Sequence, residues 1–467
     1  MTFELEQRFQ AQHTAFGQGA AASCQQRRAA LAALGRALRA QQDALVAAVN
    51  ADFGRRPAAE TQLLELVPLL DAIRHARKHL HRWMRPRRVA VNGLFRPGRA
   101  RVLYQPLGVV GIIGAWNYPI LLTLSPLVDA LAAGNHVMLK PSELAPATAA
   151  AIRALIEQVF PPEQVAVIEG GADIAAAFGA LPFDHLLFTG SARIARQVLH
   201  AAADNLTPVT LELGGKSPAL VHASFPMQEA ADRICTAKFW NAGQTCVAPD
   251  HVLLPETHAA EFLEAAGAVL RLRWPQAADN DDYAHLINDA AAIRLRELLD
   301  DALALGARAL YPVGEDCRGR AFAPVLLLDC TVDMRVMREE IFGPILPILT
   351  YRTPEDALAL LAAQPHPLAF YYFDRDRARV DRVLANTASG GVTINDCMFH
   401  LAQHNLPFGG VGPSGMGAYH GEDGFRRFSH ARGVLLQSRW VAWTMGVFKP
   451  PYRPLGRRLV QWLLSRR

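Results

Sequence analysis

Apolar side chains recur three and four positions apart through residues 20–82, a spacing that predicts two or three amphipathic helices. The Pro-, Gly- and Arg-rich stretch 84–101 interrupts this pattern and predicts an extended arm. From residue 102 onward, short apolar runs alternate with helical patterns. The apolar runs predict buried strands at 109–115, 136–140, 165–169 and 185–189. The segments between them predict helices at 119–133, 145–159 and 192–205. Such alternation indicates βαβ units, in which a parallel sheet carries helices on both faces.

A second alternating pattern runs from about residue 218 to residue 395. It predicts a long helix at 226–241, strands at 251–254 and 323–328, and a turn-rich segment at 339–350. Together the two patterns predict an α/β protein with two Rossmann-like, doubly wound lobes, one of them nucleotide-binding, plus a small β-arm.

Composition narrows the class of protein. The chain has 467 residues and is 51% hydrophobic, which is long enough for two or three domains. The first residues lack a secretory signal, and the most apolar early stretch, 107–115, is too short to span a bilayer. The six cysteines are scattered, without metal-ligand spacing, so we expect no metal site and a reducing, cytoplasmic setting.

The net charge of +5 is concentrated at the C-terminus. Residues 439–467 hold seven Lys or Arg and no Asp or Glu, so the rest of the chain carries a net charge of −2. The body of the protein therefore gives no sign of a nucleic-acid partner.

Two residues are candidates for covalent chemistry. Cys246 lies in the polar, glycine-containing segment 241–249, unlike Cys235 and Cys330, which fit a structural role better. Glu212 ends an apolar strand before a Gly-Gly turn. A carboxylate there either has a raised pKa, as a general base requires, or is neutralised by Lys216 or an arginine.

Two polar segments at predicted strand ends are further candidates. Asn117 can donate to a developing oxyanion, although a plain turn asparagine before a helix is the commoner case. Residues 188–191, Phe-Thr-Gly-Ser, end a strand and open a helix, as a phosphate site requires. The G-x-G-x-x-G match at 410–415 lacks the strand–turn–helix context, so we do not expect it to bind a dinucleotide.

Lysine is rare in this chain, since only five of the 48 basic residues are lysines. A lysine that stands where arginine is the usual cation suggests that a compact ammonium is needed, so Lys140 and Lys216 are weak candidates for hydrogen bonds to a ribose.

These segments, in order, resemble the aldehyde dehydrogenase superfamily over nearly the whole chain. The matching pieces are Trp-Asn-Tyr-Pro at 116–119, Lys-Pro-Ser-Glu at 140–143, Phe-Thr-Gly-Ser at 188–191, Leu-Glu-Leu-Gly-Gly-Lys at 211–216, Gly-Gln-Thr-Cys at 243–246 and Glu-Glu-Ile-Phe-Gly-Pro at 339–344. Residues 406–421 and 428–430 resemble the class 3 branch, and residues 82–87 and 449–452 look closest to bacterial coniferyl aldehyde dehydrogenases.

The resemblance implies a mechanism. The thiolate of Cys246 attacks the aldehyde, Asn117 and the Cys246 N–H hold the oxyanion, and Glu212 activates the water that hydrolyses the resulting thioester. It also implies NAD, with NADP possible, and the cofactor-binding set Trp116, Lys140, Ser142, Glu143, Thr189, Gly190, Ser191, Leu213, Gly214, Glu340 and Phe342. Tyr118, Phe408 and His420 are expected at the substrate pocket.

The resemblance also implies a domain plan and a partner. We expect an NAD(P)-binding domain at 1–83 and 102–214, a catalytic domain at 215–395, and oligomerisation arms of a homodimer at 84–101 and 396–438. The basic tail 439–467 has apolar residues at helical spacing, flanked by arginines at 457, 458, 466 and 467. Such a helix can make weak contact with an anionic membrane surface, but packing on the partner subunit or fraying in solvent is favoured.

One position departs from many relatives. Ala195 replaces a glycine five residues after the Thr-Gly-Ser glycine, which leaves the choice of NAD or NADP open although Glu143 favours NAD. Aromatic aldehydes such as coniferyl aldehyde are the first candidate class of substrate, and medium- or long-chain aliphatic aldehydes are the second. The rival classes are a cofactor-free thiol esterase, an inactive binding protein and a coenzyme A-acylating dehydrogenase. The nucleotide-site motifs argue against the esterase, the presence of Cys246 and Glu212 argues against the binding protein, and Glu212 argues against the coenzyme A-acylating enzyme.

Overall fold

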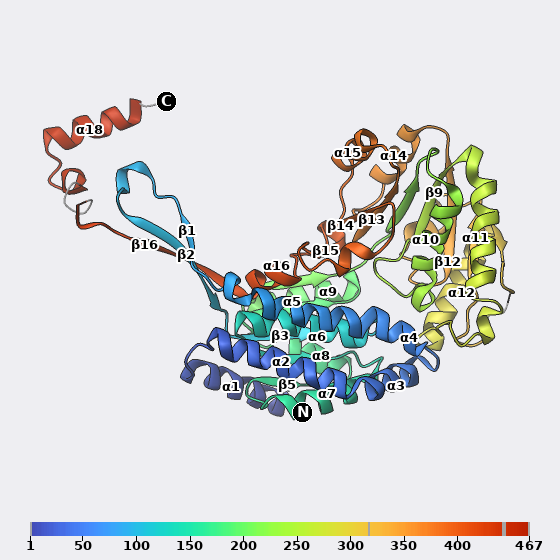
Figure 1. The fold of residues 1–467 in the computed structure, drawn as a ribbon, viewed down its shortest axis with the longest axis horizontal. Helices are drawn as coiled ribbons and strands as arrows, with labels where there is room; N and C mark the ends of the chain where they lie inside the picture. The colour runs from blue at the N-terminus through green and yellow to red at the C-terminus, as the bar shows by residue number, and fades with distance from the viewer. Residues whose placement is uncertain (1, 316–317, 441–444, 466–467) are drawn as a thin grey trace.

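The computed structural model describes residues 2–315, 318–440 and 445–465. The chain begins with helices that pack around the first lobe (Figure 1): α1 (Thr2–Gln18), α2 (Cys24–Ala40), α3 (Gln42–Phe53), α4 (Ala58–Thr61), the π-helical turn η1 (Gln62–Leu66) and α5 (Val67–Trp83). Helices at 20–82 were predicted, but α1 was not. Its apolar stripe is narrow, because Leu5 and Phe9 are its buried hydrophobic side chains among mostly polar ones.

The first sheet follows the predicted alternation. Its parallel strands are β3 (Val109–Ile113), β4 (His136–Lys140), β5 (Val165–Val167), β6 (His185–Thr189) and β7 (Val209–Glu212), in the order β7-β6-β3-β4-β5, and β15 (Gly415–Met416) adds an antiparallel edge beside β7. The connecting helices are α6 (Pro119–Ala133), α7 (Pro146–Val159), α8 (Ala172–Gly179) and α9 (Ala192–Asp204). Because helices cover both faces, the side chains of β3 and β6 are all buried.

The second sheet has the order β10-β11-β12-β9-β8-β13-β14 and is parallel except for β10. Its strands are β8 (Pro218–Val221), β9 (His251–Pro255), β10 (Arg308–Leu310), β11 (Val325–Leu328), β12 (Ile345–Tyr351), β13 (Ala369–Phe373) and β14 (Gly391–Ile394). Its helices are α10 (Met227–Phe239), α11 (Ala259–Arg273), α12 (Asp289–Ala304), α13 (Arg335–Arg338), α14 (Pro354–Ala362) and α15 (Arg377–Asn386). The predicted α/β fold with two doubly wound lobes is confirmed.

The prediction of a turn-rich segment at 339–350 is wrong for its second half, where β12 runs through the centre of the sheet. Pro344 precedes this strand and Pro347 lies within it. Pro347 is tolerated because β12 pairs with β11 through Ile345–Pro347 and with β9 from Ile348 onward, so the proline lies where the ladder changes partner.

A three-stranded antiparallel sheet of β1 (Arg87–Val89), β2 (Arg99–Pro106) and β16 (Ser429–Leu436) projects from the body, and α18 (Pro454–Ser465) lies beyond its tip (Figure 1). The arm sheet includes β2 up to Pro106, past the predicted limit at residue 101. Most of 396–428, including α16 (Gly421–Arg427), lies against the body instead of in the arm. Arginines 466 and 467 of the predicted tail lie outside the described residues. None of the described helices is long and apolar enough to cross a bilayer.

Candidate active site

The candidate residues of the first lobe gather at one edge of its sheet. β3, β4, β6 and β7 are parallel, so their carboxyl ends lie side by side. Asn117 follows β3, while Lys140, Thr189 and Glu212 end β4, β6 and β7. This edge is where doubly wound sheets bind their ligands.

Cys246 reaches this edge from the second lobe on a sharply bent loop. After α10, the residues Asn241, Ala242 and Gly243 all have positive φ values of 53°, 50° and 75°. The glycine is required, because a Cβ at Gly243 would collide with the backbone of Gly343. The bend places the partly buried Cys246 in the wall of a cavity of about 350 Å³.

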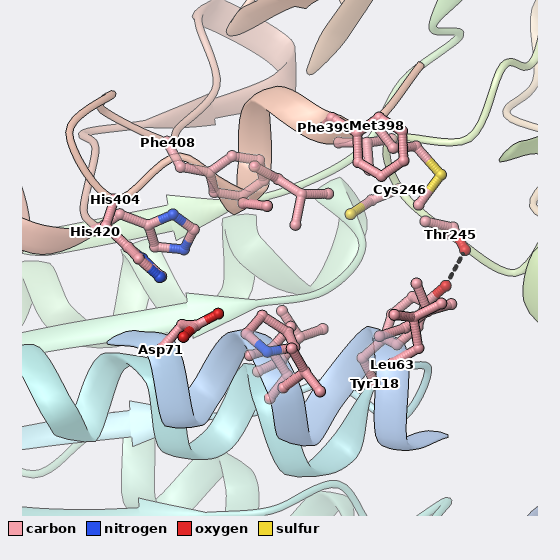
Figure 2. Close-up of a pocket in the computed structure, with 18 of the residues that line it drawn as sticks. Leu63, Asp71, Tyr118, Thr245, Cys246, Met398, Phe399, His404, Phe408 and His420 are labelled. Atoms are coloured by element: carbon pink, nitrogen blue, oxygen red, sulfur yellow. Dashed lines mark hydrogen bonds between the residues drawn. The ribbon is translucent and has the colours of Figure 1, made fainter. Parts of the chain in front are cut away.

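The cavity is lined mainly by apolar and aromatic side chains (Figure 2). The predicted pocket residues Tyr118, Phe408 and His420 all line it. Sequence reasoning missed the rest of the wall, which comes from η1 and α5, from the segment 398–404 and from scattered positions: Leu63, Leu64, Val67, Pro68, Asp71, Leu121, Leu122, Trp240, Thr245, Val247, Met398, Phe399, Leu401, Ala402, His404 and Tyr419. In Figure 2 the Cys246 sulfur points into the space between Phe408 and the helix that carries Leu63.

Asn117 is tied to the loop of Cys246. Its buried side-chain Nδ2 donates to the carbonyl of Gln244 at 3.1 Å. The next residue, Tyr118, bonds through its hydroxyl to Thr245 Oγ1 at 2.7 Å. The side chain of Asn117 does not cap α6, whose N-cap is Tyr118. The simple turn interpretation of this asparagine is therefore not what the structure shows.

Glu212 is buried at the end of β7, and neither carboxylate oxygen has a hydrogen-bond partner among the described residues. Burial raises the pKa of Glu212 well above its ordinary value, and the charge of Arg427 opposes the shift. The alternative pairing with Lys216 is wrong. Lys216 Nζ bonds to Asp250 and donates to the carbonyls of Val336 and Glu339. These bonds occupy its ammonium group, so the structure does not support the predicted hydrogen bond from Lys216 to a ribose.

Burial also raises the pKa of the Cys246 thiol, to about 12, with added contributions from the carboxyls of Glu340 and Glu212. Both effects disfavour the thiolate form of Cys246 in the free enzyme. Buried Cys235, in the middle of α10, has its pKa raised to about 12 as well. What separates Cys246 from it is the cavity beside its sulfur.

The residues expected to hold a dinucleotide surround the same edge. Lys140 Nζ lies 3.2 Å from Glu143 Oε2 after β4, and buried Ser142 accepts from the N–H of Leu144. Ser191 caps the N-terminus of α9, and Ala195 is buried in the core on that helix, so its methyl makes a helix–sheet contact.

Three observations at this edge fit a bound dinucleotide. The buried Thr189 Oγ1 has no hydrogen-bond partner within residues 2–315, 318–440 and 445–465. The carboxylate of Glu340 lies so close to Gly214 that a Cβ there would collide with it. Phe342 packs edge-on against Trp116, with 5.4 Å between ring centroids. Two further expected residues have structural contacts. A Cβ at Gly190 would collide with the ring of Phe188. The backbone N–H of Leu213 donates to the carbonyl of Ser414, the residue before β15.

The G-x-G-x-x-G match at 410–415 lies at a strand pairing and not at the start of a helix pattern. The segment 410–415 leads into β15, which pairs with β7, and Gly415 lies opposite Glu212. It is a packing turn beneath that strand. In the described part of the chain no three His, Cys, Asp or Glu side chains are grouped as a metal site requires.

Comparison with known proteins agrees with this geometry. Residues 3–434 match the aldehyde dehydrogenase family. The chain is 50% identical over 426 residues to a Pseudomonas aeruginosa protein named "Probable coniferyl aldehyde dehydrogenase", covering 91% of this chain and 89% of the relative. The structure of Staphylococcus aureus AldH in a substrate-bound state has a TM-score of 0.93 and 36% identity, covering 99% of both chains. A Mycobacterium tuberculosis aldehyde dehydrogenase complexed with NAD+ has a TM-score of 0.85 and 28% identity over 93% of this chain and 90% of that one.

The chain therefore belongs to the aldehyde dehydrogenase family. It is an NAD(P)-dependent oxidoreductase that oxidises an aldehyde to the carboxylic acid through a covalent cysteine thioester.

Proposed function

We propose that this dehydrogenase oxidises coniferyl aldehyde or a related aromatic aldehyde, with Cys246 as the nucleophile. The observation that carries the proposal is the position of the Cys246 sulfur in a cavity walled by aromatic rings, among them Phe399 and Phe408 (Figure 2). Planar aromatic substrates pack well against such rings. The name of the Pseudomonas aeruginosa relative supports the same class of substrate.

Each nearby side chain has a role that its surroundings support. The Cys246 thiolate attacks the aldehyde carbon, and the second N–H of the Asn117 amide, with the Cys246 backbone N–H, holds the oxyanion. The bound nicotinamide supplies the hydride acceptor. Glu212 then takes a proton from the water that hydrolyses the thioester, a task for which its unpaired, buried carboxylate with a raised pKa is suited.

The cofactor in this proposal is NAD in preference to NADP. Lys140 and Glu143 would hold the adenine ribose, and the Glu143 carboxylate repels a 2′-phosphate. Gly190 and Ser191 would lie at the pyrophosphate, where the N-terminus of α9 favours negative charge. Glu340 would bind the nicotinamide ribose, with Phe342 and Trp116 beside the ring.

We also propose a cytoplasmic homodimer joined through the arm sheet of β1, β2 and β16. The projecting arm leaves Leu435 and Leu436 exposed, and α18 beyond it exposes Leu455, Val460 and Leu464. A partner subunit that covers these side chains is favoured over weak contact with an anionic membrane surface. Light scattering at micromolar concentration should give a dimer. A monomer would contradict this part of the proposal, and flotation with anionic vesicles at low salt would reveal the membrane alternative.

The substrate proposal is tested by initial rates of NADH or NADPH formation with coniferaldehyde, benzaldehyde, hexanal and decanal. We expect the aromatic aldehydes to give the highest kcat/KM, by about tenfold or more over decanal, and NAD to exceed NADP. A ranking led by decanal would instead assign the enzyme to medium- or long-chain aliphatic aldehydes.

A further inference from the structure

A single buried guanidinium lies behind the Asn117 segment. Arg56 is in the loop between α3 and α4, and its side chain is completely buried. Its guanidinium carbon lies 5.0 Å from the ring centroid of Phe53 and 4.7 Å from that of Tyr118. Burying a cation is costly unless it is paired and hydrogen-bonded, so this arginine must have partners that justify its place.

Those partners include the main chain of Asn117. Arg56 Nη1 donates to the Asn117 carbonyl oxygen at 2.9 Å and lies 3.3 Å from Glu65 Oε1. Arg56 Nε lies 3.9 Å from Glu60 Oε1. Both carboxylates are themselves buried. One guanidinium thus faces two carboxylates and one backbone carbonyl, and its Nη1 makes the hydrogen bond to that carbonyl.

The two carboxylates extend the network into both halves of the site. Glu65 Oε2 accepts from the N–H groups of Ile120, at 2.8 Å, and Leu121, at 3.1 Å, in the first turn of α6. Glu60 Oε1 accepts from the N–H of Asn241 at 2.6 Å, the first of the left-handed residues before Cys246.

Asn241 completes the hydrogen-bond network between the Asn117 segment and the Cys246 loop. Its side-chain Nδ2 donates to the carbonyl of Asn117 at 3.0 Å and to that of Gln244 at 3.2 Å. The Asn117 carbonyl is therefore held by donors from Arg56 and Asn241 together. Holding a backbone carbonyl from two sides fixes the peptide plane, and with it the direction of the Asn117 side chain.

We propose that Arg56, together with Glu60 and Glu65, forms a positioning unit that fixes the Asn117 amide and the Cys246 loop relative to each other. Arg56 is not part of the cavity wall, so it acts through Asn117 and not on the substrate. The inference rests on the proposed role of Asn117 as the oxyanion donor. A displaced donor weakens transition-state stabilisation more than substrate binding, so the loss should appear in kcat.

A double-mutant cycle tests this coupling. The variants are Arg56→Met, Asn117→Ala and the double variant, assayed with coniferaldehyde and saturating NAD. We expect Arg56→Met to lower kcat/KM about 30-fold in the wild-type background, mainly through kcat, and less than about threefold in the Asn117→Ala background. Arg27→Met is the matched control. Arg27 is also buried, but it donates to the carbonyls of Ala132 and Ala133 at 3.1 and 2.6 Å, and its loss should act equally in both backgrounds.

The outcomes separate this inference from the proposed function. An equal loss from Arg56→Met in both backgrounds overturns the positioning role and leaves the oxyanion role of Asn117 intact. Wild-type turnover in Asn117→Ala overturns both. If Arg56→Met fails to show cooperative thermal unfolding, the same cycle with Arg56→Lys decides, because that variant keeps the buried charge and removes the planar fork.

Discussion

The side chain of Asn117 and the backbone of Gln244 are joined by a hydrogen bond of 3.1 Å, from Nδ2 to the carbonyl oxygen two residues before Cys246. This bond crosses from the first lobe to the second and uses only one of the two N–H groups of the amide. The other N–H is the one that the proposed mechanism assigns to the substrate oxygen, where negative charge would develop.

Replacing Asn117 with alanine should lower kcat about 10²- to 10³-fold, because one preorganised donor to the oxyanion is lost. The KM for the aldehyde should change much less. Steady-state NADH formation measures both constants. The exposed Asn205, whose side chain donates to the carbonyl of Ala180, gives a matched Asn→Ala control with unchanged kinetics. A loss confined to KM would contradict the oxyanion assignment.

Replacing Glu212 with glutamine should stall the enzyme after the first turnover. A glutamine cannot accept the proton of the hydrolytic water, so steady-state kcat should fall about 10²- to 10⁴-fold. Stopped-flow absorbance should still record a burst of about one NADH per active site, because attack and hydride transfer do not require this base. If turnover and burst disappear together, Glu212 is needed before the thioester forms and its assignment is wrong. Exposed Glu157 on α7 supplies the control Glu→Gln substitution.

The reactivity of Cys246 toward iodoacetamide should rise steadily with pH in the free enzyme. Burial, reinforced by the carboxyls of Glu340 and Glu212, raises the pKa of this thiol to about 12. The thiolate fraction, and with it the alkylation rate, should therefore grow about tenfold per pH unit from pH 6 to 9. Mass spectrometry of the Cys246 peptide follows the reaction. A plateau near pH 7 would show that the residue rests as a thiolate.

Glu60→Gln should change how stability depends on pH. Burial raises the pKa of Glu60 to about 7, against the opposing charge of Arg56. A carboxyl with a raised folded-state pKa stabilises the fold below its unfolded pKa of about 4.3, and this contribution is lost as pH rises through 7. Relative to wild type, the variant should therefore gain up to about 3 kcal/mol in free energy of unfolding between pH 4.5 and pH 8.

Urea unfolding at several pH values measures this difference. Glu169→Gln is the control for the same chemical change at an exposed carboxylate, which lies 3.3 Å from Arg153. A difference between Glu60→Gln and wild type that stays constant with pH would mean that Glu60 is ionised in the fold throughout.

Short-range patterns were sufficient to predict much of the fold. β3, β4 and β6 follow from apolar runs between helical segments, and Glu212 was recognised at a strand end because a Gly-Gly turn follows one residue later. β12 was missed because Pro347 interrupts its apolar run. The tolerance of this proline depends on which neighbouring strand pairs with each half of β12, and a local pattern does not contain that information.

The site could be predicted only where its residues lie in recognisable segments. Leu63 and His404 line the cavity from elements far apart in the chain, and no local signal marks them. The contact of Arg56 with Asn117 spans 61 positions and that of Glu60 with Asn241 spans 181. Lys216 illustrates the opposite error. Its conspicuous place after Gly-Gly indicated a ligand, but its partner, Asp250, became evident only in three dimensions.

The most direct test of the central claim is NADH formation from coniferaldehyde by wild type, Cys246→Ala and Cys330→Ala, each checked for cooperative unfolding. Cys330 is a partly buried thiol outside the cavity and serves as the matched control. We expect Cys246→Ala to lose turnover by more than about 10⁴-fold and Cys330→Ala to keep the wild-type rate. Turnover retained in a well-folded Cys246→Ala variant would contradict the thioester mechanism at this residue.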